Sequence, residues 1–276
     1  MTHEEARIWL IATLKKMNPA YSKLPVPGDE QGQKDMLRIL MNICAPSPLS
    51  SQFLEIQNAY LRRESILKGI VDERTLGPCA ADPRICIWQG DITRLKTDAI
   101  VNAANRGMTG CYQPLHGCID NAIHSAAGLE LRWICWRIMQ KQGSEEPTGQ
   151  AKITPGFCLP ARNVIHTVGP IVFGGLTDEH RRLLRSCYES CLRIAEENRL
   201  RSIAFCCIST GEFMFPPAEA AAIAVRTVRD FLDRQADRYS EIGSYLGGTD
   251  NYRGIEKVIF NVFKDSDRKI YEDLLN

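Results

Sequence analysis

Short apolar runs alternate with helix-forming segments from residue 84 to the C-terminus, and this alternation constrains the fold more than any other feature. Six runs have the length and apolar composition of buried strands. They are RICIWQ (84–89), DAIVNAA (98–104), AKITPG (151–156), NVIHTVG (163–169), SIAFCCI (202–208) and KVIFNVF (257–263). One helix is predicted after Ile119, and others at 129–140, 178–198, 217–234 and 267–275. The pattern predicts an α/β fold, a three-layer sandwich with helices on both faces of one sheet.

Residues 1–80 are predicted to form a helical N-terminal extension, and residues 81–276 a single α/β domain. Apolar positions recur at helical spacing in residues 3–17, 35–44 and 51–69, and Ser50 or Ser51 suits the cap of the third helix. Such an extension has two candidate roles, covering an apolar sheet edge or closing as a lid over a ligand. Residues 236–254 show no clear periodicity, which predicts a surface insertion.

Composition narrows the partners and the compartment. Lys and Arg total 34 against 33 Asp and Glu, a formal net charge of +1, so no basic surface indicates a nucleic-acid partner. The cysteines number 11, an odd count, and several lie in apolar runs, which favours reduced thiols over a disulfide framework. No apolar run reaches the roughly 18 residues of a membrane helix, and no signal peptide opens the sequence. We therefore expect a soluble cytoplasmic protein with no membrane partner.

The loop between the strand at 98–104 and the helix after Ile119 contains Cys111, His116 and Cys118, spaced Cys-x4-His-x-Cys. A loop that leaves a strand and enters a helix is where an open α/β sheet binds ligands. Thiolate and imidazole are ligands that zinc prefers, and three protein ligands with an open fourth position are typical of catalytic zinc sites. The trio therefore predicts a zinc site. The alternative is three incidental side chains in a cysteine-rich chain.

Four segments occur in order around this loop: GDIT (90–93), DAIVNAAN (98–105), IHSAAG (123–128) and STGEFMFP (209–216). They resemble the signature segments of macrodomains, which bind ADP-ribose, and four ordered motifs are far more specific than one. With the Cys-His-Cys loop, the chain resembles the zinc-dependent branch, whose members remove mono-ADP-ribose from proteins. The resemblance implies a three-layer α/β/α macrodomain with a mixed six-stranded sheet, preceded by an α-helical N-terminal extension.

The resemblance also implies roles for residues at both ends of a bound ADP-ribose. Asp91 resembles the family's adenine reader, supported by the Ile92 amide, and Asn105 matches the position that hydrogen-bonds the distal ribose. Asp120 matches an Asp before the Ile-His-x-Ala-Ala-Gly helix, and its carboxylate would orient or activate the attacking water. A plain helix N-cap is the alternative role of Asp120. Three neighbours at the start of this helix are also assigned to the ADP-ribose site: Cys118, Ile119 and Asn121.

The loop that follows the buried strand at 202–208 is predicted to bind the diphosphate. Glycine permits close approach of the backbone, and successive amides form an anion-binding nest. The side chain of Glu212 would repel phosphate, so we expect it to point outward. Phe213 or Phe215 is expected either to pack against the distal ribose or to belong to the core. The predicted contacts in this loop are Ser209, Thr210, Gly211, Glu212 and Phe213.

Three other polar residues near the motifs have structural roles as their first interpretation. Asn102 is expected to tie its loop together by bonding local backbone. His124 and His166 lie in apolar contexts, IHS and VIHTV, and are expected to be satisfied core histidines rather than ligands. None of the three is predicted to be a catalytic residue or a metal ligand.

The residues and the resemblance together predict a zinc-dependent hydrolase that removes mono-ADP-ribose from modified protein side chains and releases ADP-ribose. Asn105 and Asp120 are the predicted catalytic residues, and an Asp or Glu ester is the expected linkage. Two thiolates cancel the charge of the ion, so zinc is expected to act as a Lewis acid and template rather than as a strong hydroxide generator. Two alternatives use the same cavity: a reader module that binds ADP-ribose without turnover, and a deacetylase of O-acetyl-ADP-ribose.

Overall fold

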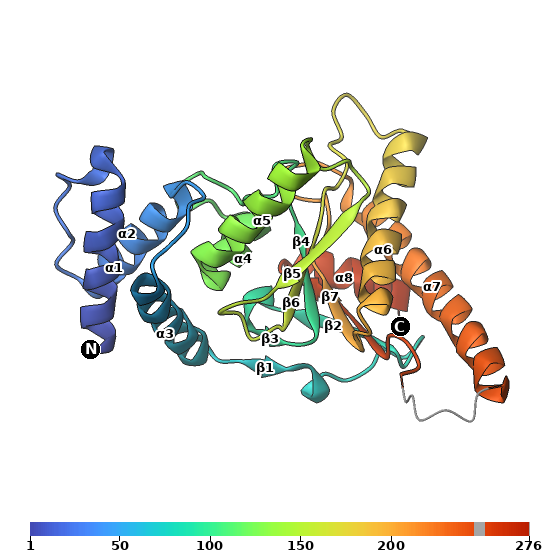
Figure 1. Cartoon of the computed structure of the whole chain (residues 1–276). Helices are drawn as coiled ribbons and strands as arrows, with labels where there is room; N and C mark the ends of the chain where they lie inside the picture. The colour runs from blue at the N-terminus through green and yellow to red at the C-terminus, as the bar shows by residue number, and fades with distance from the viewer. Residues whose placement is uncertain (246–251, 276) are drawn as a thin grey trace.

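The computed structural model describes residues 1–245 and 252–275, and six strands form one mixed sheet (Figure 1). The strands are β2 (Ile85–Gln89), β4 (Ala99–Ala103), β5 (Ala151–Pro155), β6 (Asn163–Thr167), β7 (Ser202–Phe205) and β8 (Lys257–Val262), in the order β2-β8-β7-β4-β6-β5. Within this sheet only β5 runs antiparallel to its neighbour. All six predicted strands are confirmed.

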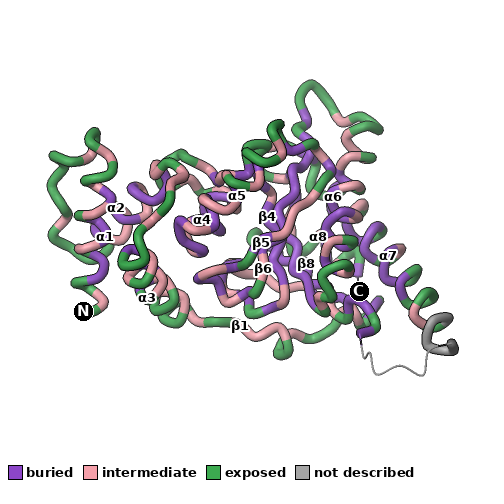
Figure 2. Tube along the Cα trace, viewed as in Figure 1, coloured by how far each residue is buried: buried purple, intermediate pink, exposed green. Residues whose placement is uncertain are grey.

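Helices cover both faces of the sheet, as the α/β pattern predicts (Figure 1). On one side lie α4 (Ile119–Ala127) and α5 (Leu129–Gln142). On the other lie α6 (Asp178–Glu197), α7 (Pro217–Tyr245) and α8 (Asp265–Leu275). The central strands β4 and β7 are therefore buried along almost their whole length (Figure 2), which explains their continuous apolar composition.

The N-terminal extension is a unit of three α-helices, α1 (His3–Met17), α2 (Glu30–Ile43) and α3 (Ser51–Lys68). Its own small core contains Leu10, Ile11, Leu14, Leu37, Leu40, Phe53 and Tyr60, and Leu129 of α5 joins that cluster. Ser50 caps α3 by accepting from the Phe53 amide, as predicted. Helix α2 begins earlier than predicted, because the Asp29 side chain caps it by accepting from the Gly32 amide.

The extension packs chiefly on α4 and on the turn after β2. Helices α2 and α3 both contact α4, and α3 also contacts the short helix η3 (Ile92–Arg94). The segment after α3 adds a two-residue parallel pair, β1 (Val71–Asp72) with β3 (Leu95–Lys96), which the sequence did not predict. The described helices of the extension therefore pack mainly against other helices. Both candidate roles, covering a sheet edge and closing as a lid, stay predictions.

Helix α7 extends well beyond its predicted end at residue 234. The surface insertion expected at 236–254 is wrong in its first part, because α7 continues to Tyr245. Residues 246–251 lie outside the described part of the chain. Gln235 of α7 contacts the segment that leads into β8. Its buried side-chain amide accepts from the Ile255 backbone N–H at 2.9 Å and donates to the Ile255 carbonyl at 3.0 Å. This tertiary contact anchors the long helix beside β8.

The cysteines agree with the expectation of reduced thiols. All 11 are free, and the buried ones are Cys86, Cys135, Cys158, Cys187, Cys191 and Cys206. Buried thiols behave as small apolar side chains in a packed core. Among the described helices, none combines the length and the apolar character needed to span a bilayer.

Replacing Phe205 with Ala should lower the free energy of unfolding by about 3 to 5 kcal/mol, because it removes a fully buried ring and leaves a cavity. The Phe205 ring packs against Tyr188 and Phe260, with centroids 4.9 and 6.5 Å away. Phe173, which is 87% exposed, supplies the matched control. Phe173→Ala should change the same free energy by less than about 0.5 kcal/mol. Urea denaturation measures both, and equal losses would contradict this placement of the core.

Candidate functional site

A cavity of about 1260 Å³ lies where β2, β4, β7 and β8 end and their following loops begin. This edge of an open α/β sheet is where such folds bind ligands. Its lining includes the predicted residues Asp91, Ile92, Asn105, Cys111, His116, Cys118, Ile119, Asp120, Ser209, Thr210, Gly211, Glu212 and Phe213. We call residues 104–118, between β4 and α4, the metal loop. Folding thus brings the metal loop and the loop after β7 into one cavity.

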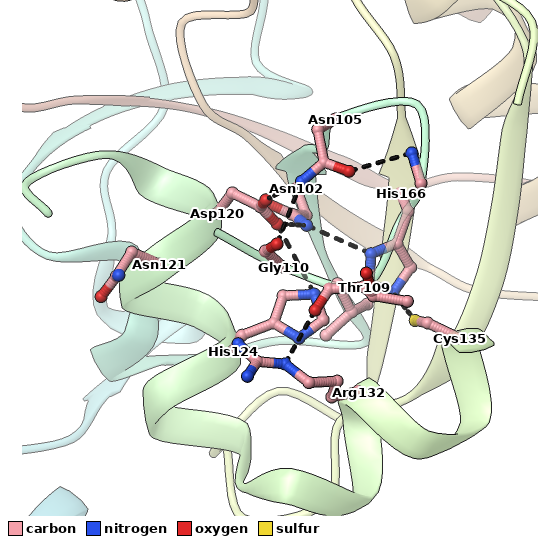
Figure 3. A network of polar contacts seen from close by, with 12 residues as sticks. Asn102, Asn105, Thr109, Gly110, Asp120, Asn121, His124, Arg132, Cys135 and His166 are labelled. Atoms are coloured by element: carbon pink, nitrogen blue, oxygen red, sulfur yellow. Dashed lines mark hydrogen bonds and ion pairs between the residues drawn. The ribbon is translucent and has the colours of Figure 1, made fainter. Parts of the chain in front are cut away.

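Asp120 lies in the first turn of α4, facing the end of β4 (Figure 3). It is 4% exposed. Its Oδ1 accepts from Asn102 Nδ2 at 2.8 Å, and its Oδ2 accepts from Asn105 Nδ2 at 3.1 Å. Burial raises the pKa of Asp120 to about 6, although the two amide donors act in the opposite direction. The carboxylate is therefore mostly ionised at neutral pH and titrates close to the range in which a general base works best.

The N-cap of α4 is Cys118 rather than Asp120. Sγ of Cys118 accepts from the Asn121 backbone N–H at 3.4 Å, whereas Asp120 lies inside the first turn. The interpretation of Asp120 as a plain N-cap is therefore wrong. Its carboxylate is held instead by tertiary contacts, with Asn102 of β4 and with Asn105 of the metal loop.

Asn102 connects the Asp120 carboxylate to a buried histidine (Figure 3). Its Nδ2 donates to Asp120 and lies 3.2 Å from Nδ1 of His166. The expectation that Asn102 bonds local backbone is therefore wrong, because its amide contacts side chains distant in sequence. Asn102 belongs to the central strand β4 and is paired there with His166 of β6, so the carboxylate is held by a residue inside the sheet.

His124 and His166 are both buried in the core, but the prediction of a satisfied core histidine holds only for His166. His166 is satisfied by Thr154, whose Oγ1 lies 2.9 Å from Nε2. Neither ring nitrogen of His124 has a hydrogen-bond partner in the described part of the chain, although Nε2 lies 3.5 Å from Asp120 Oδ1. Burial lowers the pKa of both histidines, to about 3 for His166. Both rings are therefore neutral at physiological pH.

The ligand atoms of Cys111, His116 and Cys118 lie within 4.8 Å of one another in the cavity wall. Sγ of Cys111 is 3.5 Å from Nδ1 of His116. Tetrahedral zinc sets a thiolate sulfur and an imidazole nitrogen about 3.5 Å apart, given the usual metal–ligand bond lengths. Within the described residues, no fourth Cys, His or carboxylate joins this trio. The donor set fits zinc with three protein ligands.

Two further contacts suit a metal centre at this position. Sγ of Cys118 sits at the N-terminus of α4, which favours a thiolate. Burial nevertheless raises the pKa of Cys118 to about 11, so a metal ion that bound here would have to displace its proton. His116 directs Nδ1 toward Cys111, while its Nε2 lies 3.6 Å from Oε1 of Glu212. A carboxylate near the outer ring nitrogen can orient a histidine ligand. The Glu212 side chain is 69% exposed and lines the cavity, so its carboxylate lies beside His116 and not away from the site, and the expected outward orientation is not confirmed.

At the other end of the cavity, Asp91 forms an ion pair that the sequence did not reveal. Its Oδ2 lies 2.6 Å from Nζ of Lys68 on α3, and its Oδ1 accepts from the Thr93 amide at 2.9 Å. Burial disfavours the ionised form, but these contacts outweigh it and lower the pKa of Asp91. Phe263, which follows β8, also lines the cavity and is 74% exposed. Ile92 lines it as well, with a side chain that is 1% exposed.

The loop after β7 passes very close to Gly169, which follows β6. A Cβ at Gly169 would lie 2.1 Å from Oγ of Ser209, so a larger residue would displace this loop. Ser209 itself has φ 66°, and its buried Oγ has no hydrogen-bond partner among the described residues. Phe215 is 1% exposed and belongs to the core, whereas Phe213 lines the cavity. Of the two candidate aromatic contacts, only Phe213 can reach a ligand.

Asn121 is the predicted site residue that the cavity lining does not include. Its side chain is fully buried, donates to the Gln113 carbonyl at 2.9 Å and accepts from Arg38 at 2.8 Å. Asn121 therefore supports the metal loop through the Gln113 carbonyl and does not line the cavity. The predicted contact with ADP-ribose does not fit the position of this side chain.

Several cavity residues escaped sequence reasoning because they belong to the extension. They are Leu37, Arg38, Tyr60, Glu64 and Lys68. Their spacing is that of ordinary amphipathic helices, and no local pattern shows which helix residues will face a loop far along the chain. Only the packing of α2 and α3 against α4 places them at the cavity.

Comparison with known proteins agrees with this geometry. A family model for the macro domain matches residues 101–224. A Treponema medium protein named protein-ADP-ribose hydrolase is 49% identical over 278 residues, which cover 100% of both chains. The chain belongs to the macrodomain family. A Staphylococcus aureus (strain MRSA252) relative of this macrodomain has the same name and is 41% identical, covering 97% of this chain and 94% of the relative.

Solved macrodomain structures share this fold. The Trypanosoma brucei macrodomain in complex with ADP-ribose is 32% identical, with a TM-score of 0.62, and the match covers 83% of this chain and 92% of that one. The Oceanobacillus iheyensis macrodomain with ADP is 38% identical, with a TM-score of 0.56, covering 68% of this chain and 88% of that one. Both matches agree with the three-layer architecture of this macrodomain.

His166 should make the macrodomain sensitive to mild acid. Its folded-state pKa is about 3, below the unfolded value of 6.5, so its contribution to stability is present above pH 6.5 and is lost as pH falls. By pH 5 the loss reaches about 2 kcal/mol. Between pH 7.5 and pH 5, the free energy of unfolding of His166→Gln should therefore fall by about 2 kcal/mol less than that of the parent chain. Urea denaturation with a chelator present measures this, and parallel pH profiles would contradict the assignment.

Proposed function

We propose that this macrodomain is a zinc-dependent hydrolase that removes mono-ADP-ribose from modified Asp or Glu side chains of proteins and releases ADP-ribose. One observation carries the proposal: the buried Asp120 carboxylate, held by Asn102 and Asn105, shares a cavity with the Cys111, His116 and Cys118 donor set. The relatives named protein-ADP-ribose hydrolase, which match this macrodomain over nearly its whole length, support the reaction class.

The cavity offers a path for the nucleotide that runs between its two ends. Asp91 would accept from the exocyclic amine of adenine, which requires the Lys68 ammonium, now 2.6 Å from the carboxylate, to share or leave it. The loop from Ser209 to Phe213 would bind the diphosphate through its backbone amides. The distal ribose would then lie beside Asn105 and Asp120. The structure of the Trypanosoma brucei macrodomain with ADP-ribose supports ADP-ribose as the ligand class.

Asp120 would act as the general base for an attacking water molecule. The water oxygen forms a bond to the anomeric carbon, its proton passes to Asp120, and the bond to the protein side chain breaks. The modified Asp or Glu leaves as a free carboxylate. Asn102 and Asn105 hold both oxygens of Asp120 and thereby fix the direction from which it accepts the proton.

Cys111, His116 and Cys118 would hold zinc at the ribose end of the cavity. When bound, zinc would supply Lewis-acid stabilisation and a template for the distal ribose. Glu212 would orient His116 through the outer ring nitrogen, which is 3.6 Å away. Loss of any one of the three ligands would leave too few donors to hold the ion in this loop.

Asp120→Asn should reduce the rate of ADP-ribose release by about 10²- to 10⁴-fold while leaving ADP-ribose binding largely intact, because the amide keeps the shape but cannot take a proton. Asp237→Asn, an exposed change on α7, is the matched control and should have no effect. Release assays on proteins modified at Asp or Glu, Ser and Arg, with calorimetry for binding, measure both properties and the linkage. Binding without release in the parent chain would indicate a reader module. Release of acetate from O-acetyl-ADP-ribose alone would indicate the deacetylase.

Removing the metal should abolish release, and added zinc should restore it, because three ligands alone do not supply the Lewis acid. Cys111→Ser should lower zinc content and activity together, whereas Cys79→Ser, also half-buried but outside the trio, should change neither. Metal analysis and the release assay on the same preparations test this. A zinc-free preparation that works at the full rate would refute the metal requirement.

A further inference from the structure

Helix α2 of the extension reaches the metal loop through Arg38. Nη2 of Arg38 donates to the His116 backbone carbonyl at 3.1 Å and to Oδ1 of Asn121 at 2.8 Å, and Nε donates to the same Oδ1 at 3.2 Å. One planar guanidinium therefore joins the backbone of a predicted metal ligand to the first turn of α4. This forked geometry is specific to arginine, because lysine presents a single point donor.

A second residue of α2 holds the loop one helical turn further on. Oδ1 of Asn42 accepts from the Leu115 amide at 3.1 Å, and its Nδ2 donates to Ser125 Oγ of α4 at 2.9 Å. Asn42 is 1% exposed. Leu115 has φ 54°, a backbone conformation that a non-glycine residue adopts only when its surroundings hold it there. The Asn42 contact supplies such a restraint next to His116.

Arg132 of α5 joins the C-terminus of α2 to the metal loop. Its Nη1 donates to the carbonyls of Met41, Asn42 and Cys44 at the C-terminus of α2, at 2.9, 2.6 and 2.7 Å. Its Nε donates to the Thr109 carbonyl in the metal loop at 2.8 Å. The buried guanidinium thus satisfies the free carbonyls at the end of α2 and ties the start of the metal loop to them.

We propose that Arg38 and Asn42 of the N-terminal extension are positioning residues of the metal centre, so that zinc affinity depends on the docking of α2 against the metal loop. The inference rests on the proposed function, because it takes Cys111, His116 and Cys118 as the zinc ligands. Neither Arg38 nor Asn42 is among the proposed ligands. Both act through the backbone that carries His116.

The physical reason is preorganisation. The metal loop has no regular secondary structure between β4 and α4, so ordering it costs conformational entropy. Contacts from α2 hold the loop in the conformation that gathers the three ligand atoms within 4.8 Å of one another, and so offset part of that cost. If these contacts are removed, binding of the ion would itself have to order the loop, and zinc affinity would fall. By thermodynamic reciprocity, bound zinc must in turn stabilise the docking of α2.

Zinc affinity of the full-length chain, measured by competition with a chelating dye, tests the proposal. Arg38→Ala and Asn42→Ala should each weaken zinc binding by about 10- to 100-fold, the usual cost of losing a partner behind a metal ligand. Asn58→Ala is the matched control. Asn58 also joins the extension to the domain, donating to Glu130 on α5 at 2.8 Å, but it does not touch the metal loop. Its loss should leave zinc affinity unchanged.

Two further readouts separate positioning from general stability. In the cobalt-substituted chain, Arg38→Ala should change the visible absorption bands, which report ligand geometry, and Asn58→Ala should not. Hydrogen exchange should show that zinc protects amides of α2 in the parent chain but not in Arg38→Ala. Arg38→Lys keeps the charge and lacks the fork, so its zinc affinity should stay well below that of the parent.

The outcomes are distinguishable. A parent chain that binds zinc, together with Arg38→Ala and Asn42→Ala variants of undiminished affinity, would overturn the inference and leave the proposed function standing. Full recovery in Arg38→Lys would also overturn it, because charge rather than position would then be the cause. A parent chain that binds no zinc would overturn both proposals. Weaker binding in Arg38→Ala and Asn42→Ala, unchanged binding in Asn58→Ala and loss of α2 protection would establish the positioning role.

Discussion

Holding an ionisable carboxylate inside the protein is the constraint on which this site depends. Asp120 is 4% exposed, and burial opposes its charge. The side-chain amides of Asn102 and Asn105 offset part of that cost by donating one hydrogen bond to each oxygen. Asn102 is fixed on β4, which is paired on both sides within the sheet. The hydrogen bond from Asn102 therefore ties the proposed base to a central strand.

The metal loop depends on a different part of the molecule. Its proposed zinc ligands are placed by neighbours in α4 and by side chains of α2, which belongs to the extension rather than to the α/β domain. The domain boundary predicted near residue 80 therefore marks a change in secondary-structure pattern. The site spans that boundary. Residues on both sides of it line one cavity. An isolated α/β domain would lack one wall of that cavity and two restraints on the loop.

Much of the fold was predictable because it is local. Each strand has an apolar run of its own, and the third helix of the extension has its cap, Ser50, next to it in sequence. The errors fall where distant contacts decide. Helix α7 runs past residue 234, and its Gln235 bonds the backbone of Ile255, which lies far along the chain. Asn102 points away from its own backbone because its amide bonds Asp120 and lies beside His166. Asn121 turns away from the cavity because Arg38 and Gln113 hold it.

By itself, the sequence determined the α/β class, the order of the six strands along the chain, and the chemical identity of the donor trio and the carboxylate. The class and the strand order follow from periodicity, and the trio follows from side-chain type and spacing, which are local properties. Asp120 was assigned through the resemblance to macrodomains. Tertiary structure alone decided that Lys68 meets Asp91, that Glu212 approaches His116, and that Arg38 supports the metal loop. These contacts join residues far apart along the chain. Their existence depends on how whole helices pack, and no short segment encodes that information.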